Sequence, residues 1–161
     1  MTAELIPYTF KDTGRTVMIR KISPYLINEL RKVYPPPEPP MQEVDYDGEK
    51  IVEPNPAHPD YPKMMADYNT MIEQKMRRLI IKRGVVVNFT PEIEQEIEEL
   101  REFWASETEG HQIEETDDAV FYVTYLCFGS DTDTEELIDA IMRRSQPTRE
   151  DVELTKAAFR G

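Results

Sequence analysis

Apolar residues recur along the chain at spacings that predict short strands first and helices later. Residues 8–10 and 15–20 alternate in character around the turn Asp12-Thr13-Gly14, a pattern typical of a β-hairpin. Ser23-Pro24 then has the form of a helix start, and the apolar residues after it keep helical spacing up to Val33. The N-terminal part therefore predicts a hairpin followed by a short helix.

Proline interrupts this pattern in two stretches, residues 34–40 and 54–62. Because proline lacks an amide donor and disfavours helical geometry in the residue before it, both stretches predict extended connectors. Between them, residues 42–46 and 50–53 flank Asp47-Gly48, which is a strong signal for a two-residue hairpin turn. We therefore expect a small hairpin between two stiff connectors.

Beyond the connectors the spacing is helical. Residues 63–83 form the longest predicted helix, with Gly84 where a C-terminal cap would lie, and residues 85–87 predict a brief strand or an extended link. Thr90-Pro91 then begins a helix that reaches about Ser106. The inner face of that helix is expected to carry Ile93, Ile97, Leu100 and Trp104.

The apolar run at residues 119–128 fits either a strand or a buried helix. We favour a helix, since Gly129 follows like a cap and the neighbouring segments are helical. Residues 132–135 have the form of a capping box, with Thr132 opening the next helix, and Thr148 opens the last one. The residues expected to point inward from the capping-box helix are Leu137, Ile138, Ile141 and Met142.

These elements predict an α+β protein that is predominantly helical. Residues 1–34 form an N-terminal hairpin-and-helix lobe, residues 35–62 a proline-rich connector with its hairpin, and residues 63–161 a C-terminal helical bundle. We expect the three parts to form one compact domain.

The composition adds a strongly acidic surface. The 161 residues include 32 acidic side chains against 19 Lys and Arg, a formal net charge of −13. Because binding to a phosphate backbone needs clustered Lys and Arg, nucleic acid is not expected as a partner. The longest apolar run is far shorter than the roughly 20 residues that cross a bilayer, so we expect a soluble, cytosolic protein that binds no membrane.

The sequence contains no recognisable catalytic or metal-binding motif. Its two histidines, His58 and His111, lie in separate loops without further ligands at helical spacing. The only cysteine, Cys127, lies in the apolar run, where burial raises the pKa of a thiol and leaves it unreactive. The six glycines are scattered singly, so no phosphate-binding loop is present. We therefore expect no enzyme activity, no metal and no cofactor.

Charge is segregated along the helical part of the chain. Residues 92–118 contain twelve acidic side chains against Arg101, whereas residues 71–83 contain five basic side chains against Glu73. One interpretation is that these two segments pack together and neutralise each other. The other is an acidic docking surface that attracts a basic partner. The residues expected to form that surface are Glu94, Glu98, Glu99 and Glu102.

Methionine and aromatic side chains supply candidate apolar contacts. Methionine adapts well to irregular apolar partners, although at helical spacing it is more often part of a core, and the same alternative holds for the aromatic run. The residues predicted to bind a partner are Met64, Tyr68, Met71 and Met76 on the long helix, with Phe121, Tyr122 and Tyr125 in the apolar run.

The order of these segments resembles one protein family. The chain carries in turn an apolar hairpin, the Ser23-Pro24 helix, the run Pro35-Pro36-Pro37-Glu38-Pro39-Pro40, the Gly48 hairpin, the segment from Glu53 to Tyr61, and a Met-rich basic helix that ends in Gly84-Val85. This order is similar to that of the tail assembly chaperones of long-tailed bacteriophages, and the segment from Glu53 to Tyr61 carries most of the likeness. The C-terminal residues 144–152 and Phe159 also look like the usual ending of that family.

The resemblance implies an assembly factor of the host-cell cytoplasm that is absent from the mature virion. Such chaperones bind the long, helical, aggregation-prone tape measure protein, keep it soluble, and help to recruit tail tube subunits, which displace the chaperone as the tube polymerises. They are often made in two forms, the longer by ribosomal frameshifting. The implied partners are thus the tape measure protein and the tail tube protein, with self-association left open.

Two other functions remain as alternatives. The chain could be a structural component of the tail, or an acidic mimic of nucleic acid that inhibits a DNA-binding host protein. A mimic needs carboxylates spaced like phosphates along an exposed face, and residues 92–118 are the candidate segment.

Overall fold

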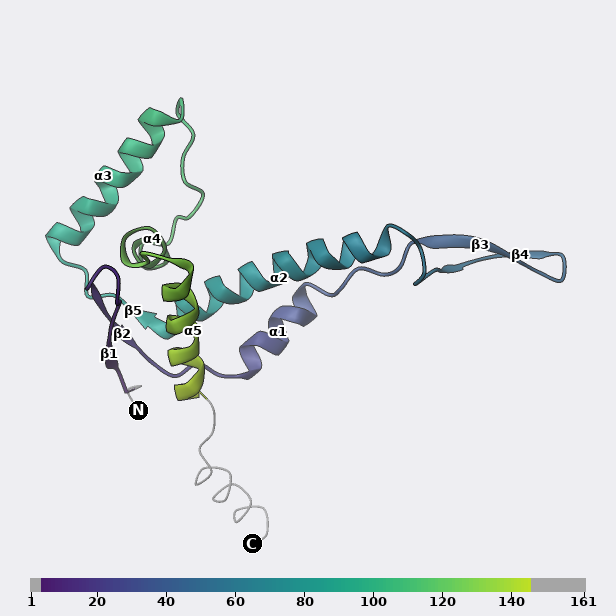
Figure 1. The fold of residues 1–161 in the computed structure, drawn as a ribbon, viewed down its shortest axis with the longest axis horizontal. Helices are drawn as coiled ribbons and strands as arrows, with labels where there is room; N and C mark the ends of the chain where they lie inside the picture. The colour runs from purple at the N-terminus through teal and green to yellow at the C-terminus, as the bar shows by residue number, and fades with distance from the viewer. Residues whose placement is uncertain (1–3, 146–161) are drawn as a thin grey trace, which may run out of the picture. The chain divides into compact units, whose positions relative to one another are not determined.

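The computed structural model describes residues 4–145 of the chain (Figure 1). It confirms an α+β protein that is predominantly helical, with 53% helix and small antiparallel sheets. The helix predicted to begin at Thr148 lies outside the described residues. Within the described part, no helix is both long enough and apolar enough to span a membrane.

The chain divides into two compact units. One contains Met1–Pro24 and Arg78–Gly161, and the other contains Tyr25–Arg77. This division differs from the boundaries after residues 34 and 62, and from the single compact domain, that the sequence predicts. The difference arises because the N-terminal hairpin shares its sheet with a strand that follows the long helix. Pairing between distant segments therefore defines the first unit.

A three-stranded antiparallel sheet organises the first unit. The predicted N-terminal hairpin forms β1 (Ile6–Thr9) and β2 (Thr16–Ile19), and β2 also pairs with the brief predicted strand β5 (Val85–Val86). The backbone N–H of Gly14 donates to the carbonyl of Phe10 at 2.8 Å, which closes the hairpin turn. Gly14 has a φ of 72°, a conformation that glycine adopts without strain.

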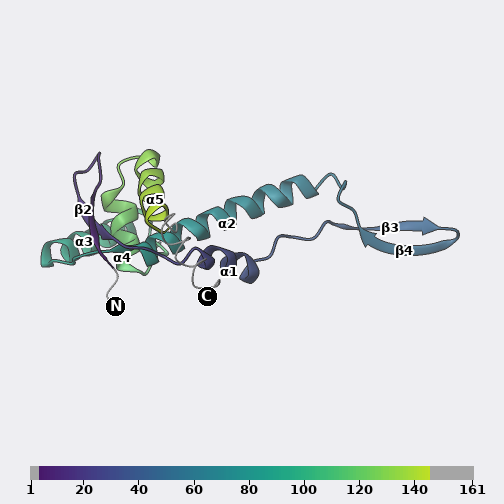
Figure 2. The same cartoon turned by 90° about the horizontal axis from the view of Figure 1, so that it is seen from below.

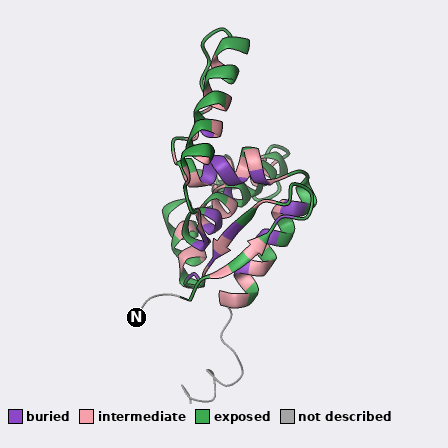
Figure 3. Ribbon diagram, turned by 90° about the vertical axis from the view of Figure 1, so that its left-hand side faces the viewer, coloured by how far each residue is buried: buried purple, intermediate pink, exposed green. Residues whose placement is uncertain are grey.

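The first unit also contains most of the helices. The apolar run is helical as predicted, and it is buried nearly all round, which explains why it lacks the alternation of a half-buried strand. Buried segments, drawn purple, lie on the strands and the neighbouring helices (Figure 3). The helical elements of this unit are the end of α2 (Tyr61–Gly84), α3 (Pro91–Glu107), α4 (Asp118–Tyr122), the π-helical segment η1 (Val123–Cys127) and α5 (Asp131–Ser145).

The core of this unit joins all of these elements. The ring of Phe10, which follows β1, packs edge to face on the ring of Phe128 with centroids 5.6 Å apart. Burial of such side chains is the main favourable contribution to folding. The largest fully buried side chains are Phe10, Phe121, Leu137, Ile141, Val123 and Cys127.

Gly84 and Gly129 are not the helix caps that the sequence predicts, since neither has the positive φ of a left-handed cap. A Cβ atom on Gly84 would lie 2.7 Å from Cγ2 of Ile141, and one on Gly129 would lie 2.6 Å from Cβ of Asp12. The predicted helix-capping role is therefore wrong for both glycines. These glycines allow close packing between segments that are distant in sequence.

The helix starts agree with the sequence at one position and differ at another. Thr90 caps α3 as predicted, because its side-chain oxygen accepts a hydrogen bond from the N–H of Ile93 at 3.3 Å. Helix α5 already begins at Asp131, so Thr132 lies inside the first turn and the predicted cap is wrong. Instead, the buried carboxylate of Asp133 accepts a hydrogen bond from the N–H of Gly129 at 2.8 Å.

The second unit contains α1 (Tyr25–Val33), the first part of α2, and a ribbon of β3 (Met41–Tyr46) and β4 (Glu49–Pro54). The predicted helix and hairpin are thus confirmed. Asp47 and Gly48 have φ values of 49° and 87°, as the predicted tight hairpin turn requires. The ribbon extends away from both helices of this unit (Figures 1 and 2), and none of its residues is buried.

Tyr34 joins the two helices of the second unit. The hydroxyl of Tyr68 donates a hydrogen bond to the carbonyl of Tyr34 at 2.7 Å, and the ammonium of Lys75 lies 4.4 Å from the centroid of the Tyr34 ring. Both contacts hold the end of α1 against α2 at the point where the first proline-rich stretch begins.

Candidate functional site

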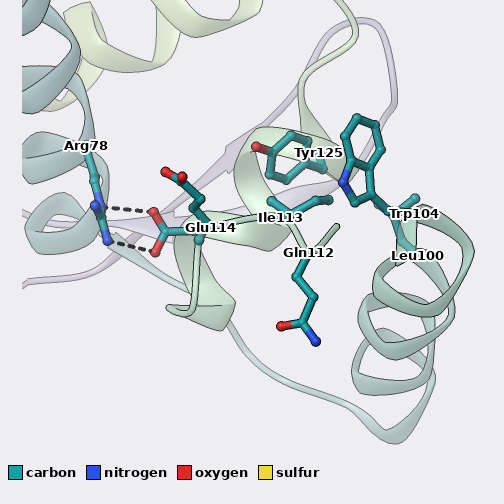
Figure 4. A pocket seen from close by; sticks show the side chains of 8 residues that line it. Arg78, Leu100, Trp104, Gln112, Ile113, Glu114 and Tyr125 are labelled. Carbon is teal, nitrogen blue, oxygen red and sulfur yellow. Dashed lines mark hydrogen bonds and ion pairs between the residues drawn. The ribbon is translucent and has the colours of Figure 1, made fainter. Parts of the chain in front are cut away.

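An open hollow in the first unit has predominantly apolar walls. It has a volume of about 640 Å³ and is bounded by α3, the loop that follows α3, η1 and one residue of α2. Figure 4 shows the rings of Trp104 and Tyr125 on one side, with Ile113 and Leu100 beside them. We call this hollow the aromatic groove, and the residues that line it are Arg78, Leu100, Trp104, Gln112, Ile113, Glu114, Glu115 and Tyr125.

Two half-exposed aromatic side chains are the main feature of the aromatic groove. The exposed fractions are 43% for Trp104 and 47% for Tyr125. The sequence predicts Trp104 on the inner face of its helix, but only Ile97 on that face is buried. Trp104 lies in the last turn of α3, where the inner face opens onto the groove. The Tyr125 ring packs against the buried Phe121 ring with centroids 4.9 Å apart, which fixes its position.

Arg101 holds the wall of the groove in place. Its guanidinium donates hydrogen bonds to the carbonyl of Glu115 at 2.7 Å and to Oδ1 of Asp118 at 3.1 Å, and lies 4.1 Å from the centroid of the Phe121 ring. These contacts join α3 to the following loop and to α4. The loop residues Gln112 and Ile113 therefore have a defined position although they belong to neither helix.

The basic end of α2 neutralises the loop and not the acidic helix. Arg78 pairs with Glu115 through two contacts, at 2.9 and 3.0 Å, which are dashed in Figure 4, and Lys82 lies 3.9 Å from Asp117. The neutralisation that the sequence suggests is thus found at Glu115 and Asp117.

The acidic surface predicted on α3 remains exposed. Glu94, Glu98 and Glu102 recur every four residues and share one face of the helix. Their side chains make no ion pair or hydrogen bond with any residue that the structure describes. Glu99 is also exposed and accepts a hydrogen bond from Gln95 at 2.9 Å. Glu96 differs, because it pairs with Arg15 at 2.6 Å.

The predicted apolar contact residues divide into three groups. Tyr125 lines the aromatic groove as an exposed side chain. Phe121 and Tyr122 are 0% and 3% exposed, so these two residues belong to the core and have no surface to offer a partner. The prediction that Phe121 and Tyr122 bind a partner is therefore wrong. Met64, Tyr68, Met71 and Met76 are partly buried and lie on α2 in the second unit, and none of them lines the groove.

Cys127 is buried as the sequence predicts. Burial away from water raises the pKa of the Cys127 thiol to about 12, an effect that the nearby Tyr122 hydroxyl and Arg15 partly offset. The thiol is therefore protonated at neutral pH and unreactive. His58 and Asp60 approach each other at 3.9 Å, but among the described residues no three His, Cys, Asp or Glu side chains are placed to hold a metal ion.

Sequence reasoning did not find the loop side of the groove. Gln112, Ile113 and Glu114 lie in a segment that the sequence presents only as a polar loop. Two features of the sequence could have indicated the groove: Ile113, an isolated apolar residue in that loop, and the single tryptophan, which lies near the end of an otherwise acidic helix. Neither residue indicates by its position in the sequence that the two meet.

The fold and the groove define an α+β protein with an open, apolar, aromatic-lined hollow, one wall of which is the helix that carries the exposed acids. This arrangement suits the binding of another macromolecule. Comparison with protein-family models, with curated proteins and with solved structures gave no match for this chain.

Proposed function

We propose that this protein is a tail assembly chaperone of a long-tailed bacteriophage. In this role it binds the tape measure protein, keeps it soluble and helps to recruit tail tube subunits, and it leaves before the virion is complete. The observation that carries the proposal is the aromatic groove, an open apolar surface on the helix α3, which also carries the exposed carboxylates of Glu94, Glu98 and Glu102.

A chaperone for an apolar client needs exposed apolar surface to bind the client and must itself remain soluble. The described residues leave twelve large apolar side chains exposed, on a chain with a net charge of −13. A high net charge keeps molecules apart in solution, while exposed apolar side chains bind surfaces that the client would otherwise bury by aggregating. The combination supports a holding function.

The order of elements in the structure is consistent with the resemblance on which the proposal rests. Hairpin β1–β2, α1, the first proline-rich stretch, hairpin β3–β4, the second proline-rich stretch and α2 follow one another as in the family resemblance. The proposed location, the host-cell cytoplasm, follows from this role.

Co-expression of the chain with the tape measure protein of the same phage tests the proposal. Only the chaperone carries a tag, and the measured quantities are the soluble fraction of the tape measure protein and its recovery with the tag. We expect the client to be insoluble alone and to become soluble and co-purify in the presence of the chain. A client that stays insoluble and does not co-purify would overturn the proposal.

Purified virions provide the complementary measurement. The chaperone function requires the chain to be absent from mature particles, whereas a structural tail component would be present in stoichiometric amounts. Detection of the chain in virions by mass spectrometry, at the level of a tail protein, would favour the structural alternative.

A further inference from the structure

We propose that the aromatic groove binds the apolar face of a basic amphipathic helix, with Trp104 as the central contact. This inference rests on the proposed function and specifies where the client binds and what chemistry the bound segment has. The groove lies entirely within the first unit.

The walls of the groove select an apolar face. Trp104, Tyr125, Leu100 and Ile113 present ring and alkyl surface to a hollow of about 640 Å³, a volume in the range of ligand-binding pockets. Large aromatic side chains that are half exposed before binding and buried after it dominate the energetics of many interfaces. The groove is open to solvent, so a helix laid across it can insert side chains at the spacing of three and four residues.

The charges around the groove select a basic helix. Arg78 is already paired with Glu115 through two contacts and offers no free positive charge. Glu114 is exposed at the rim, and Glu102 lines a smaller hollow of about 220 Å³ that shares Gln112 and Ile113 with the groove. The uncompensated charge near the groove is thus negative, and Lys or Arg on the flanks of a bound helix would complement it.

The same charges disfavour a second copy of this chain as the occupant. Residues 92–118 carry twelve acidic side chains against one Arg, so two copies facing each other through this segment would bring like charges together. An acidic helix is disfavoured for the same reason.

Trp104 provides a direct probe, because it is the only tryptophan in the chain. The test titrates the full chain with a synthetic helical peptide of about 20 residues that has leucine on one face and lysine on the other. We expect saturable binding with a blue shift of the Trp104 emission as the ring leaves water. A peptide with the same composition in scrambled order, which has no apolar face, should bind at least ten times more weakly.

Two alanine variants separate the groove from the rest of α3. Trp104→Ala should weaken binding of a labelled peptide at least ten-fold by fluorescence anisotropy, whereas Phe103→Ala should change it less than two-fold. Phe103 is a matched control, because it is 60% exposed, adjacent in sequence, and does not line the groove. Circular dichroism of both variants checks that the helices are retained. Equal effects of the two variants, or peptide binding without a shift of the Trp104 emission, would overturn the inference.

The test distinguishes failure of the site from failure of the proposed function. If Trp104→Ala still solubilises the tape measure protein as well as the unmodified chain does, the groove is not the client site and this inference is wrong, while the chaperone function stands. If the peptide binds at the groove as expected but the chain never solubilises the tape measure protein, the groove stands and the proposed function is wrong.

Discussion

Gly84 determines how closely two helices of the first unit pack. It ends α2 at a buried position, and Ile141 of α5 occupies the space that a side chain would need. Its carbonyl also accepts a hydrogen bond from the N–H of Arg20 at 2.9 Å, which joins the end of α2 to the end of β2. The absence of a side chain at Gly84 thus allows α2, α5 and the three-stranded sheet to pack together.

Substitution of Gly84 with alanine should destabilise the first unit. The added Cβ would lie 2.7 Å from Cγ2 of Ile141, and overpacking of this kind costs about 1–3 kcal/mol of unfolding free energy. Urea denaturation measures the loss. In an Ile141→Ala background, which removes the clashing atoms, the same substitution should cost much less. An equal cost in both backgrounds would show that the contact with Ile141 is not the cause.

Burial of Cys127 should make stability depend on pH in the alkaline range. Because burial raises the pKa of the thiol from 9.0 to about 12, the folded state holds its proton more tightly than the unfolded state does. The resulting stabilisation is complete below about pH 9 and is lost as the pH rises towards 12. The difference in unfolding free energy between the unmodified chain and Cys127→Ala should therefore shrink over this range. A difference that stays constant with pH would contradict the burial of the thiol.

The loop between α3 and α4 is ordered by electrostatic contacts and contributes one wall of the groove. Arg101 on α3 contacts Glu115 in the loop, Asp118 at the start of α4, and the ring of Phe121. Glu115 in turn pairs with Arg78 of α2. Three helices thus meet through two arginines, and the positions of the groove residues depend on them.

Replacement of Arg101 with methionine should loosen this loop. Methionine retains much of the apolar stem but loses both hydrogen bonds. A hydrogen bond to a charged group contributes about 1.5–3 kcal/mol when it is shielded from water, and less where the partner is exposed, as Asp118 is. We expect a lower unfolding free energy and faster amide hydrogen exchange in residues 112–117.

The matched control for Arg101→Met is Arg77→Met. Arg77 makes an exposed pair with Glu73 one helical turn away at 2.8 Å, a type of contact that contributes about 0.3–0.5 kcal/mol. Comparable losses in the two variants would show that the loop does not depend on Arg101.

The charge of the whole chain opposes folding and favours association with basic partners. With a net charge of −13, the folded state suffers self-repulsion that salt screens. Several surface acids are compensated locally, as in the pair of Glu96 with Arg15, whereas Glu94, Glu98 and Glu102 are not compensated by any described residue. The unpaired acids on α3 should therefore contribute to repulsion in the first unit.

Salt and neutralising substitutions should both raise the thermal midpoint. A change from about 0.01 M to 0.1 M salt shortens the screening length from about 30 Å to about 10 Å. We expect the midpoint of thermal unfolding to rise by about 2–4 °C, and Glu94→Gln/Glu98→Gln/Glu102→Gln to raise it at low salt and to reduce its salt dependence. Calorimetric scans measure both effects. A triple variant at the paired acids Glu43, Glu73 and Glu96 serves as control and should not raise the midpoint.

Most individual elements could be predicted from local pattern, and the candidate site could be predicted only in part. The β1–β2 turn at Gly14, the Asp47-Gly48 hairpin and the Thr90 cap depend on residues next to each other in the chain, so the sequence indicates them directly. Helical periodicity indicates which residues share a face of a helix, and on that basis Trp104 is predicted to be buried. Periodicity does not indicate how far along the helix its packing partner extends, and Trp104 is in fact exposed.

Local preferences and composition are enough to predict the α+β class, the location of the hairpins and helices, the acidic face of α3 and the burial of Cys127. Contacts in the folded chain are needed to show that β5 completes the N-terminal sheet, that Gly84 and Gly129 serve close packing, that Phe121 and Tyr122 are core, and that Trp104, Ile113 and Tyr125 share one groove. These features join residues that are far apart in the chain, and a single sequence does not state which distant segments meet.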